Sequence, residues 1–357
     1  MVHIKRIVVL GFVMCLISCH SNRNNNIKLQ FPYLFNTDFI ANNGSVIYCD
    51  TNYVIRKIST ASNDINWEFN LERKMEFLKI ENIDKYLFIG GNTKNNYSYW
   101  LIEINDGSII TKNTFDFDTY HKPLFIENKL YFINSKSQII KCNINSNICD
   151  VVSVEGIEPR VPNNLVKYKD KLYTSHDGNL VEINIETLEI SNITPLNIKF
   201  QGVIDFNFLV KGNIIIPSDN EIIIFDLDSN KLKCRYSATD IFSNNQDYYC
   251  GIIAHKNTII TKSMNGYIQI YDIDNLNDVK LLETDDAPIL CDNSIEVIDK
   301  YILNSNYSNV ELYNIETLEK LKTIKEKKTS SFVKSDNSIL FINMENELCK
   351  IDLKEID

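Results

Sequence analysis

The sequence lacks any long run of basic residues, and acidic residues outnumber basic ones. It has 37 Lys and Arg against 47 Asp and Glu, a formal net charge of −10. The densest basic stretch is Lys325–Lys328, which reads Lys-Glu-Lys-Lys. A nucleic-acid-binding protein needs a positive face that neutralises phosphates, so we expect no nucleic acid as a partner.

The sequence also lacks the short motifs that mark common catalytic sites. It contains no Gly-x-Ser-x-Gly, no His-Glu-x-x-His and no phosphate-binding loop. His176 precedes the turn dipeptide Asp177-Gly178, so we expect a solvated hairpin side chain there rather than a ligand. We therefore predict that the protein is not an enzyme and has no cofactor. The histidines beyond residue 18 are scattered over the chain, at His20, His121, His176 and His255.

One acidic pattern imitates a metal site. Asp226-x-Asp228-x-Asn230 resembles the start of a calcium loop, whose sixth position should be Gly for the sharp turn. That position is Lys231, so we interpret these side chains as solvated carboxylates at a corner and predict no metal. Similar pairs occur at the expected ends of other strands, at Asp116/Asp118 and Asp272/Asp274.

Glycine, proline and tryptophan are scarce, with 11, 7 and 2 residues in a chain of 357. No stretch of 12 residues has the pattern of an amphipathic helix. The chain is instead rich in Asn, Ile, Tyr and Phe, with 18 Tyr and 18 Phe. Ile, Tyr and Phe favour pleated, half-buried positions, so the composition predicts an all-β fold.

The N-terminus has the pattern of a signal peptide. His3, Lys5 and Arg6 precede the apolar run Ile7–Ile17. A membrane-spanning helix needs roughly 20 residues, and this run is about half that length, as in the core of a signal peptide. We expect residues 1–18 to be removed, which changes the net charge from −10 to −12 because Lys5 and Arg6 are lost. The alternative is a buried apolar helix.

The segment Leu16-Ile17-Ser18-Cys19 resembles the lipobox of bacterial lipoproteins, in which the Cys thiol takes a diacylglycerol. We therefore predict lipidation at Cys19 and a membrane contact through this lipid. Residues 19–26 are polar and are expected to form a flexible tether. By resemblance to lipoprotein sorting in Gram-negative bacteria, His20 in place of Asp favours the outer membrane, on the periplasmic side, with the cell surface as an alternative.

A repeat of about 42 residues fills the rest of the chain. An apolar strand, a turn and a second strand ending near Asn or Asp recur eight times. The hexapeptide Asn-Ile-Glu-Thr-Leu-Glu even occurs twice, at 184–189 and 314–319. The first strand of this recurring pair begins every 37 to 45 residues, near Val46, Leu87, Leu130, Leu172, Ile214, Ile259, Ile302 and Ile339.

A repeat of this length with four short strands is typical of a β-propeller blade. Residues 27–357 are therefore expected to form a single β-propeller of eight four-stranded antiparallel blades, with seven blades as the alternative. The last repeat ends after its third strand. We expect the strand-like segment Ile27–Leu34 to supply its missing outer strand and so close the ring. The fourth repeat is expected to form strands Leu165–Tyr168, Leu172–Thr174, Leu180–Ile185 and Leu188–Ile193.

The first repeat carries a family resemblance in Val46-Ile47-Tyr48, Val54–Ile58 and Asn66-Trp67-Glu68-Phe69. These segments resemble the quinoprotein-like (PQQ-like) propeller repeat, and the resemblance assigns Trp67 to docking between blades. Quinone-dependent dehydrogenases with this repeat need an adjacent Cys pair and a stacking Trp. Here no adjacent Cys pair exists and only two Trp occur, so the resemblance does not imply the cofactor.

A lipidated protein with eight such repeats is similar to the B component (BamB) family of the outer-membrane β-barrel assembly machine. The resemblance implies a periplasmic scaffold that binds the central barrel protein through loops on one rim. We predict a monomeric, non-catalytic scaffold with a protein partner in the cell envelope. The alternatives are a propeller that binds a glycan or peptide and, third, a propeller enzyme.

Seven cysteines remain after residue 19, an odd number that leaves at least one thiol unpaired in a monomer. Cys142 and Cys149 flank a hairpin, and a two-residue turn at Asn145-Ser146 would place them directly opposite. We expect that register to make them a hydrogen-bonded pair, which suits a cross-strand disulfide less well. A bridge and two buried free thiols both remain open.

Overall fold

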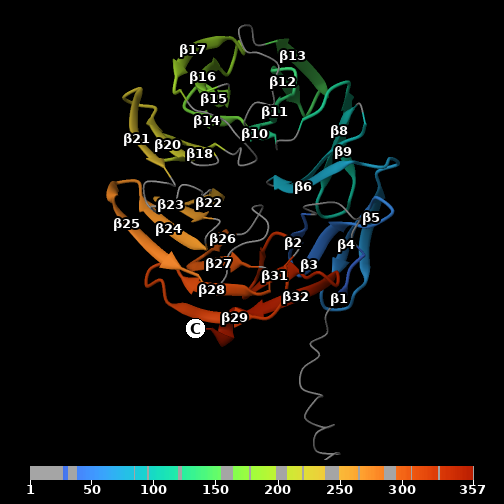
Figure 1. The fold of residues 1–357 in the computed structure, drawn as a ribbon. Coiled ribbons are helices and arrows are strands. Elements are labelled where there is room, and N and C mark those ends of the chain that lie inside the picture. Colours follow the sequence, from blue (N-terminus) through green and yellow to red (C-terminus); the bar gives the residue numbers. More distant parts are fainter. Residues whose placement is uncertain are drawn as a thin grey trace, which may run out of the picture.

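The structure is a computed structural model, and the chain folds into a ring of eight antiparallel sheets of four strands each (Figure 1). This arrangement confirms the predicted eight-bladed β-propeller; the alternative of seven blades is wrong. The predicted signal peptide, Cys19 and the tether lie outside the described residues. The structure describes residues 27–30, 38–83, 85–94, 96–119, 123–153, 164–176, 178–197, 207–218, 221–237, 249–263, 266–284, 295–306, 308–328 and 330–356.

The first strand of each blade lies at the centre of the ring and is mostly short (Figure 1). Because the strands of a blade alternate in direction, all inner strands begin at one end of the ring, here called the top face, and end at the bottom face. In chain order the inner strands are β2 (Ile40–Asn42), β6 (Phe77–Ile83), β10 (Leu124–Ile126), β14 (Val166–Tyr168), β18 (Phe208–Val210), β22 (Tyr249–His255), β26 (Ile295–Ile298) and β30 (Val333–Ser335).

The second strands carry the most deeply buried residues of the molecule. In β3, β19 and β31 every residue is buried, because each blade is covered on both faces by its neighbours. Strands buried on both faces are continuously apolar rather than alternating, which explains the Ile- and Leu-rich runs. The second strands are β3 (Ser45–Cys49), β7 (Tyr86–Asn92), β11 (Lys129–Ile133), β15 (Lys171–His176), β19 (Asn213–Pro217), β23 (Thr258–Ser263), β27 (Tyr301–Ser305) and β31 (Ser338–Ile342).

The third strands pair with the second strands along most of their length, as the repeated sequence pattern predicts. Between them lie the turns of the top face, where Gly178 and Gly266 take φ angles of +78° and +86°, as expected for tight hairpins. The third strands are β4 (Val54–Ser59), β8 (Tyr97–Glu103), β12 (Gln138–Asn143), β16 (Asn179–Asn184), β20 (Glu221–Asp226), β24 (Tyr267–Asp272), β28 (Val310–Asn314) and β32 (Glu347–Asp352).

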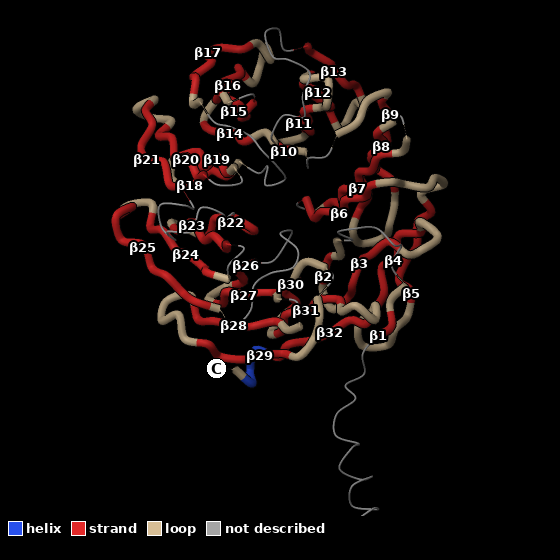
Figure 2. The backbone as a smooth tube through the Cα atoms, viewed as in Figure 1, coloured by secondary structure: helices blue, strands red, loops and turns tan. Residues whose placement is uncertain are grey.

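The outer strands alternate between exposed and partly buried residues, because only one side of each packs on the ring. The six residues of β17 follow this pattern throughout. Figure 2 shows that strands make up most of the described backbone, beside one short helix near the C-terminus, η1 (Leu353–Glu355). The outer strands are β5 (Ile65–Asn70), β9 (Ile109–Phe115), β13 (Ile148–Ser153), β17 (Ile190–Pro195), β21 (Lys231–Ser237), β25 (Asn275–Glu283), β29 (Lys320–Ile324) and β1 (Ile27–Lys28).

The ring closes as predicted, through pairing of the two ends of the chain. Strand β1 completes the last blade by pairing Ile27 with Leu348 and Lys28 with Glu347 of β32. The backbone N–H of Leu29 then donates to the carbonyl of Asn346 at 2.8 Å. The strand is shorter than the expected Ile27–Leu34, of which residues 31–34 lie outside the described part. Pairing of this kind removes the free edge that would otherwise separate the first and last blades.

One backbone bond recurs in all eight blades and ties the two turns of the bottom face together. The residue after each third strand donates its N–H, at 2.9 to 3.3 Å, to a carbonyl in the turn that follows the inner strand of the same blade. These bonds satisfy buried turn groups. The pairs are Thr60–Gly44, Ile104–Lys85, Ile144–Asn128, Ile185–Asp170, Leu227–Gly212, Ile273–Asn257, Ile315–Lys300 and Leu353–Asn337.

The repeated hexapeptide makes the same bottom-face turn twice. Asn184 accepts hydrogen bonds from the backbone N–H groups of Glu186 and Thr187 through its side-chain oxygen, and Asn314 does the same in its blade. Leu188 then takes a φ of +61°, a left-handed conformation inside the turn. The predicted outer strand Leu188–Ile193 therefore begins two residues too early, and the observed strand is β17.

Trp67 on β5 lies between the first two blades. Its side chain is 8% exposed, and its Nε1 donates to the carbonyl of Ile104 at 3.0 Å. The indole covers Gly107, which has a φ of +77°; a Cβ there would lie 2.9 Å from the ring. A bulky ring on one blade thus fits a glycine turn on the next.

Among the described residues, no helix is long and apolar enough to span a membrane.

Candidate functional site

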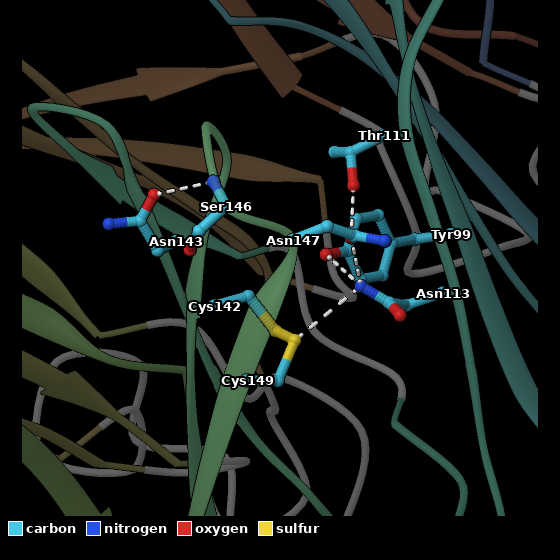
Figure 3. Close-up of a disulfide and its surroundings, with 8 residues drawn as sticks. All are labelled: Tyr99, Thr111, Asn113, Cys142, Asn143, Ser146, Asn147 and Cys149. Carbon is cyan, nitrogen blue, oxygen red and sulfur yellow. Dashed lines mark hydrogen bonds between the residues drawn. A yellow bond between two sulfur atoms is a disulfide. The ribbon is translucent and has the colours of Figure 1, made fainter.

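Cys142 and Cys149 form a disulfide across the hairpin of β12 and β13 (Figure 3). They lie directly opposite, as expected, but their Cα atoms are 4.0 Å apart, closer to the spacing of a non-hydrogen-bonded pair than of a hydrogen-bonded one. The expected hydrogen-bonded geometry is therefore wrong. The reason is that the strands end at Asn143 and Ile148, so that four residues rather than two form the turn.

The disulfide lies against the preceding blade. Asn113 on β9 donates from its side chain to Asn147 Oδ1 at 2.7 Å and to the sulfur of Cys149 at 3.5 Å, and Thr111 also binds Asn147 (Figure 3). Among the described cysteines, Cys49, Cys234 and Cys349 are free thiols. The disulfide thus fixes the turn between β12 and β13 in the conformation in which Asn147 contacts Thr111 and Asn113 of the preceding blade.

Reduction of this disulfide is expected to destabilise the third blade. It closes a loop with a sequence separation of 7, for which chain entropy predicts about 2 to 3 kcal/mol. Thermal unfolding with and without dithiothreitol measures the effect. A double variant, Cys142→Ser with Cys149→Ser, should already melt at the lower temperature and no longer respond to the reductant. An unchanged melting curve after confirmed reduction would contradict this expectation.

The expectation of a solvated His176 is wrong. This side chain is only 4% exposed, at the end of β15 and opposite Asn179. The strand extends two residues beyond its predicted end at Thr174, which carries His176 into the interior. His255, at the end of β22, is half-buried, and its Nε2 atom has no hydrogen-bond partner. Burial lowers the pKa of His255, as does Lys256 nearby, while Asp299 opposes the shift.

The carboxylates that imitate a calcium loop serve the turn and the neighbouring blade. Asp226 Oδ1 accepts the backbone N–H groups of Asp228 and Ser229 at 2.9 and 3.0 Å. Asp228 binds Lys169 Nζ at 2.5 Å and the Tyr168 hydroxyl at 2.7 Å, both from the preceding blade. Within the part of the chain that the structure describes, no three His, Cys, Asp or Glu side chains gather as a metal site would require.

Charged side chains and one serine from four neighbouring blades lie near one another towards the top face, the end at which the inner strands begin. We call this group the top-mouth cluster. It joins blades that are distant in sequence, because the last blades and the first become neighbours only when the ring closes. Its members are Asp38, Lys79, Glu81, Glu296, Lys328 and Ser331.

Lys328 and Glu296 form the most buried pair of the cluster. Lys328 Nζ lies 2.9 Å from Glu296 Oε1, with the two side chains 4% and 20% exposed. Glu296 also accepts the backbone N–H of Phe332, and the Lys328 ammonium lies 4.1 Å from the centre of the Phe332 ring. Burial lowers the pKa of Lys328, although Glu296 and Asp38 oppose the shift. Each charge is thus compensated within the site, as buried ions require.

Asp38 provides a second contact across the closure of the ring. Its Oδ1 accepts a hydrogen bond from the Ser331 hydroxyl of the last blade at 3.1 Å. Burial raises the pKa of Asp38; Lys79 and Ser331 lower it, and Glu81 and Glu296 raise it further. Titratable groups with opposed shifts in one place are more frequent at functional sites than elsewhere, which makes this cluster the leading candidate.

Replacing Asp38 with Asn is expected to stabilise the protein at neutral pH. Because its pKa is raised above the ordinary value of 3.8, the folded state favours the neutral carboxyl. Below pH 3.8 wild type and variant should unfold alike. As the pH rises through the raised pKa, wild type loses stability and the variant does not. Melting temperatures between pH 3.5 and 7.5 test this.

Asp106→Asn is the matched control, with the opposite sign. Hydrogen bonds from Ser108 lower the pKa of this exposed carboxyl, so its contribution is present at neutral pH and is lost as the pH falls. The variant should therefore be less stable than wild type at pH 7.5 and similar to it at low pH. Equal pH profiles for the two variants would contradict the assignment of Asp38.

A second set of polar side chains forms a buried hydrogen-bond network between the sixth and seventh blades. Lys262 on β23, with no exposed surface, donates to the carbonyl of Ser305 at 3.0 Å and to Asn306 Oδ1 at 3.1 Å. Asn306 in turn donates to Glu311 Oε2, which also accepts from Tyr313 at 2.8 Å. Lys320 Nζ binds the other oxygen of Glu311 at 2.9 Å and Asn304 donates to Oε2. A buried lysine and a buried glutamate are thus linked through one amide.

On the bottom face a cleft of about 710 Å³ lies where the last blade meets its two neighbours. One wall is β32, and the other walls come from β29 and from the turns of the first blade. Lys350 is exposed on this wall, beside Ile351 and Asp352. The lining residues from the other walls include Gly44, Thr60, Lys322 and Ile324.

The sequence matches no family model and no curated protein. Solved structures do match it over most of both chains. The likeness is one of fold. The computationally designed Ika8 protein has a TM-score of 0.69 at 11% identity, covering 91% of this chain and 98% of that one. BamB from Moraxella catarrhalis has a TM-score of 0.64 at 11% identity, covering 93% of this chain and 99% of that one. Sqt1 from Saccharomyces cerevisiae has a TM-score of 0.67 at 9% identity, covering 92% of this chain and 97% of that one.

Proposed function

We propose that this protein is a non-catalytic, membrane-anchored scaffold that binds a protein partner through its top face. The observation that carries the proposal is the top-mouth cluster, where charges from four blades converge on one surface. The cluster has three carboxylates and two ammonium groups, which favours a partner that brings a basic side chain. The fold shared with BamB supports a role in interaction and leaves its partner to experiment.

The anchor in this proposal is a lipid on Cys19, which holds the protein to the outer membrane on its periplasmic side. Strand β1 runs from the bottom face towards the top face, because it is antiparallel to β32. Ile27 is therefore the bottom-side end of β1, and in this proposal a lipid ahead of it leaves the top face turned towards partners. Replacing Cys19 with Ser should move the protein from the membrane fraction to the soluble fraction.

Site-specific cross-linking in membranes tests the interaction. A photoreactive residue at Lys79, on the top face, should form adducts with a partner protein. The same residue at Lys256, in an exposed turn of the bottom face, is the matched control and should form none. Adducts with the barrel-assembly core would support the assembly role suggested by the resemblance. Equal adducts from both positions, or none from Lys79, would contradict the proposal.

A further inference from the structure

Four large apolar side chains are exposed at the bottom ends of three successive outer strands, and we call them the bottom-rim row. Outer strands begin at the bottom face, and these residues are the first or second of β5, β9 and β13. The members are Ile65, Ile109, Ile110 and Ile148, which are 54%, 49%, 41% and 64% exposed. Exposed apolar groups on neighbouring elements mark a contact with protein or membrane more often than scattered single side chains do.

The three blades that carry the row pack against one another at their bottom corners. Trp67, on the same strand as the first member of the row, covers Gly107 in the turn before β9. Asn147, in the turn before β13, accepts a hydrogen bond from Thr111 on β9. The row therefore belongs to one packed corner of the ring rather than to three independent strands.

This corner is also poor in charge. The turns that lead into its outer strands (60–64, 104–108 and 144–147) contain two charged residues, Asp64 and Asp106. The repeated hexapeptide instead puts two glutamates into the equivalent turn of the fourth blade and two into that of the seventh. A partner selected by charge would bind that other half of the bottom face, whereas an apolar environment fits the row.

The row begins beside the closure of the ring. Ile65 lies directly opposite Ile58 of the neighbouring strand. Ile58 packs in one cluster with Leu29, next to β1, and with Leu348 of β32. The first member of the row is thus close to the point at which the start of the chain joins the last blade.

We propose that the bottom-rim row contacts the phospholipid surface of the membrane that holds the protein, an inference that rests on the proposed lipid at Cys19. Residues 20–26 span at most roughly 24 Å, so this lipid keeps the bottom end of β1 near the membrane. The row gives a second contact, in which apolar side chains enter the headgroup region. The ring then leans on the membrane along the last blade and the first three, and the turns with paired glutamates are lifted from it.

Photo-cross-linking to phospholipid tests the contact. The mature chain, with a hexahistidine tag ahead of residue 19, is held on vesicles of phosphatidylethanolamine and phosphatidylglycerol that contain a nickel-chelating lipid. Benzoylphenylalanine in place of Ile109 should form adducts one phospholipid heavier than the protein. The matched control is the same replacement of Leu232, which is 48% exposed at the bottom end of β21 in the fifth blade. It should give at least tenfold fewer adducts.

Substitutions within the row provide a second measurement. With the photoreactive residue at position 110, the adduct yield should fall at least fivefold when the other three members are replaced with Ser. Because all three side chains are exposed, the fold should persist, which circular dichroism checks. The control replaces three exposed residues of the fourth to sixth blades and should leave the yield unchanged: Ile193→Ser, Leu232→Ser and Leu281→Ser.

Equal adducts from positions 109 and 232, or none from position 109, would overturn the inference. Adducts that join two copies of the chain would overturn it too, since a second copy would then cover the row. The tag holds the chain in place of a lipid, so the result does not depend on Cys19. Failure of the proposed anchor appears instead in the fractionation of Cys19→Ser, and failure of the proposed scaffold in the adducts at Lys79.

Discussion

Replacing Trp67 with Ala is expected to lower the free energy of unfolding by about 3 to 5 kcal/mol. The substitution removes a nearly buried indole between the first two blades and leaves a cavity over Gly107. It also leaves the carbonyl of Ile104 without the bond from Nε1, although Lys57 Nζ still donates to it at 3.2 Å. Urea unfolding followed by circular dichroism measures the change.

Trp67→Phe separates packing from hydrogen bonding. It keeps an aromatic ring over the glycine turn and removes the Nε1 donor, so we expect a loss of about 1 kcal/mol from the bond and a further loss from the smaller ring. Gly107→Ala should also destabilise, because its Cβ would meet the indole at 2.9 Å and its φ is +77°. If Trp67→Ala unfolds within 1 kcal/mol of wild type, blade docking through this residue is wrong.

Replacing Glu311 with Ala should cost about 3 kcal/mol, because it removes a fully buried carboxylate that accepts several hydrogen bonds, although its ion-pair partner Lys320 is 32% exposed. Glu311 has no exposed surface and accepts from Asn304, Asn306, Tyr313 and Lys320. The variant removes the shared carboxylate acceptor of all four donors, and Asn304 and Asn306 keep only longer bonds, to Asn306 Oδ1 at 3.2 Å and Asn309 Oδ1 at 3.3 Å. Urea unfolding again provides the measurement.

Glu186→Ala is the matched control for that experiment. Glu186 also forms an ion pair, with Lys141 of the neighbouring blade, but its side chain is 76% exposed and the separation is 3.9 Å. Exposed pairs contribute about 0 to 1 kcal/mol, so this variant should resemble wild type. A loss in Glu311→Ala no greater than in the control would show that the buried network does not stabilise the contact between the sixth and seventh blades.

The fold followed from the sequence because each blade is a local unit. Short, largely apolar strands alternate with turns that need Asn, Asp or Gly, and this pattern is readable in any one repeat. The predicted ends of the strands were less accurate, because a single residue with a left-handed backbone conformation can lengthen a turn and shift the start of the next strand. Leu188, an apolar residue, takes a left-handed conformation inside a turn, and nothing in its side chain signals this.

The top-mouth cluster could not be found from local patterns. Asp38 and Ser331 are 293 residues apart and meet only because the ring closes. The buried network between the sixth and seventh blades is only weakly indicated by the sequence, through the charged residues Lys262 and Glu311 within two buried strands. A charge in such a run indicates a buried partner, but spacing along the chain does not say which one.

The sequence by itself determined the strand repeat and the propeller fold, and it favoured eight blades over seven and a closing role for the segment that begins at Ile27, because these depend on periodic side-chain patterns and on counting units. Only the tertiary structure decided which charges meet, which thiols bond and how far β1 covers β32. Those outcomes depend on contacts between residues that are distant in the chain, and such contacts are set by ring curvature and turn geometry rather than by local spacing.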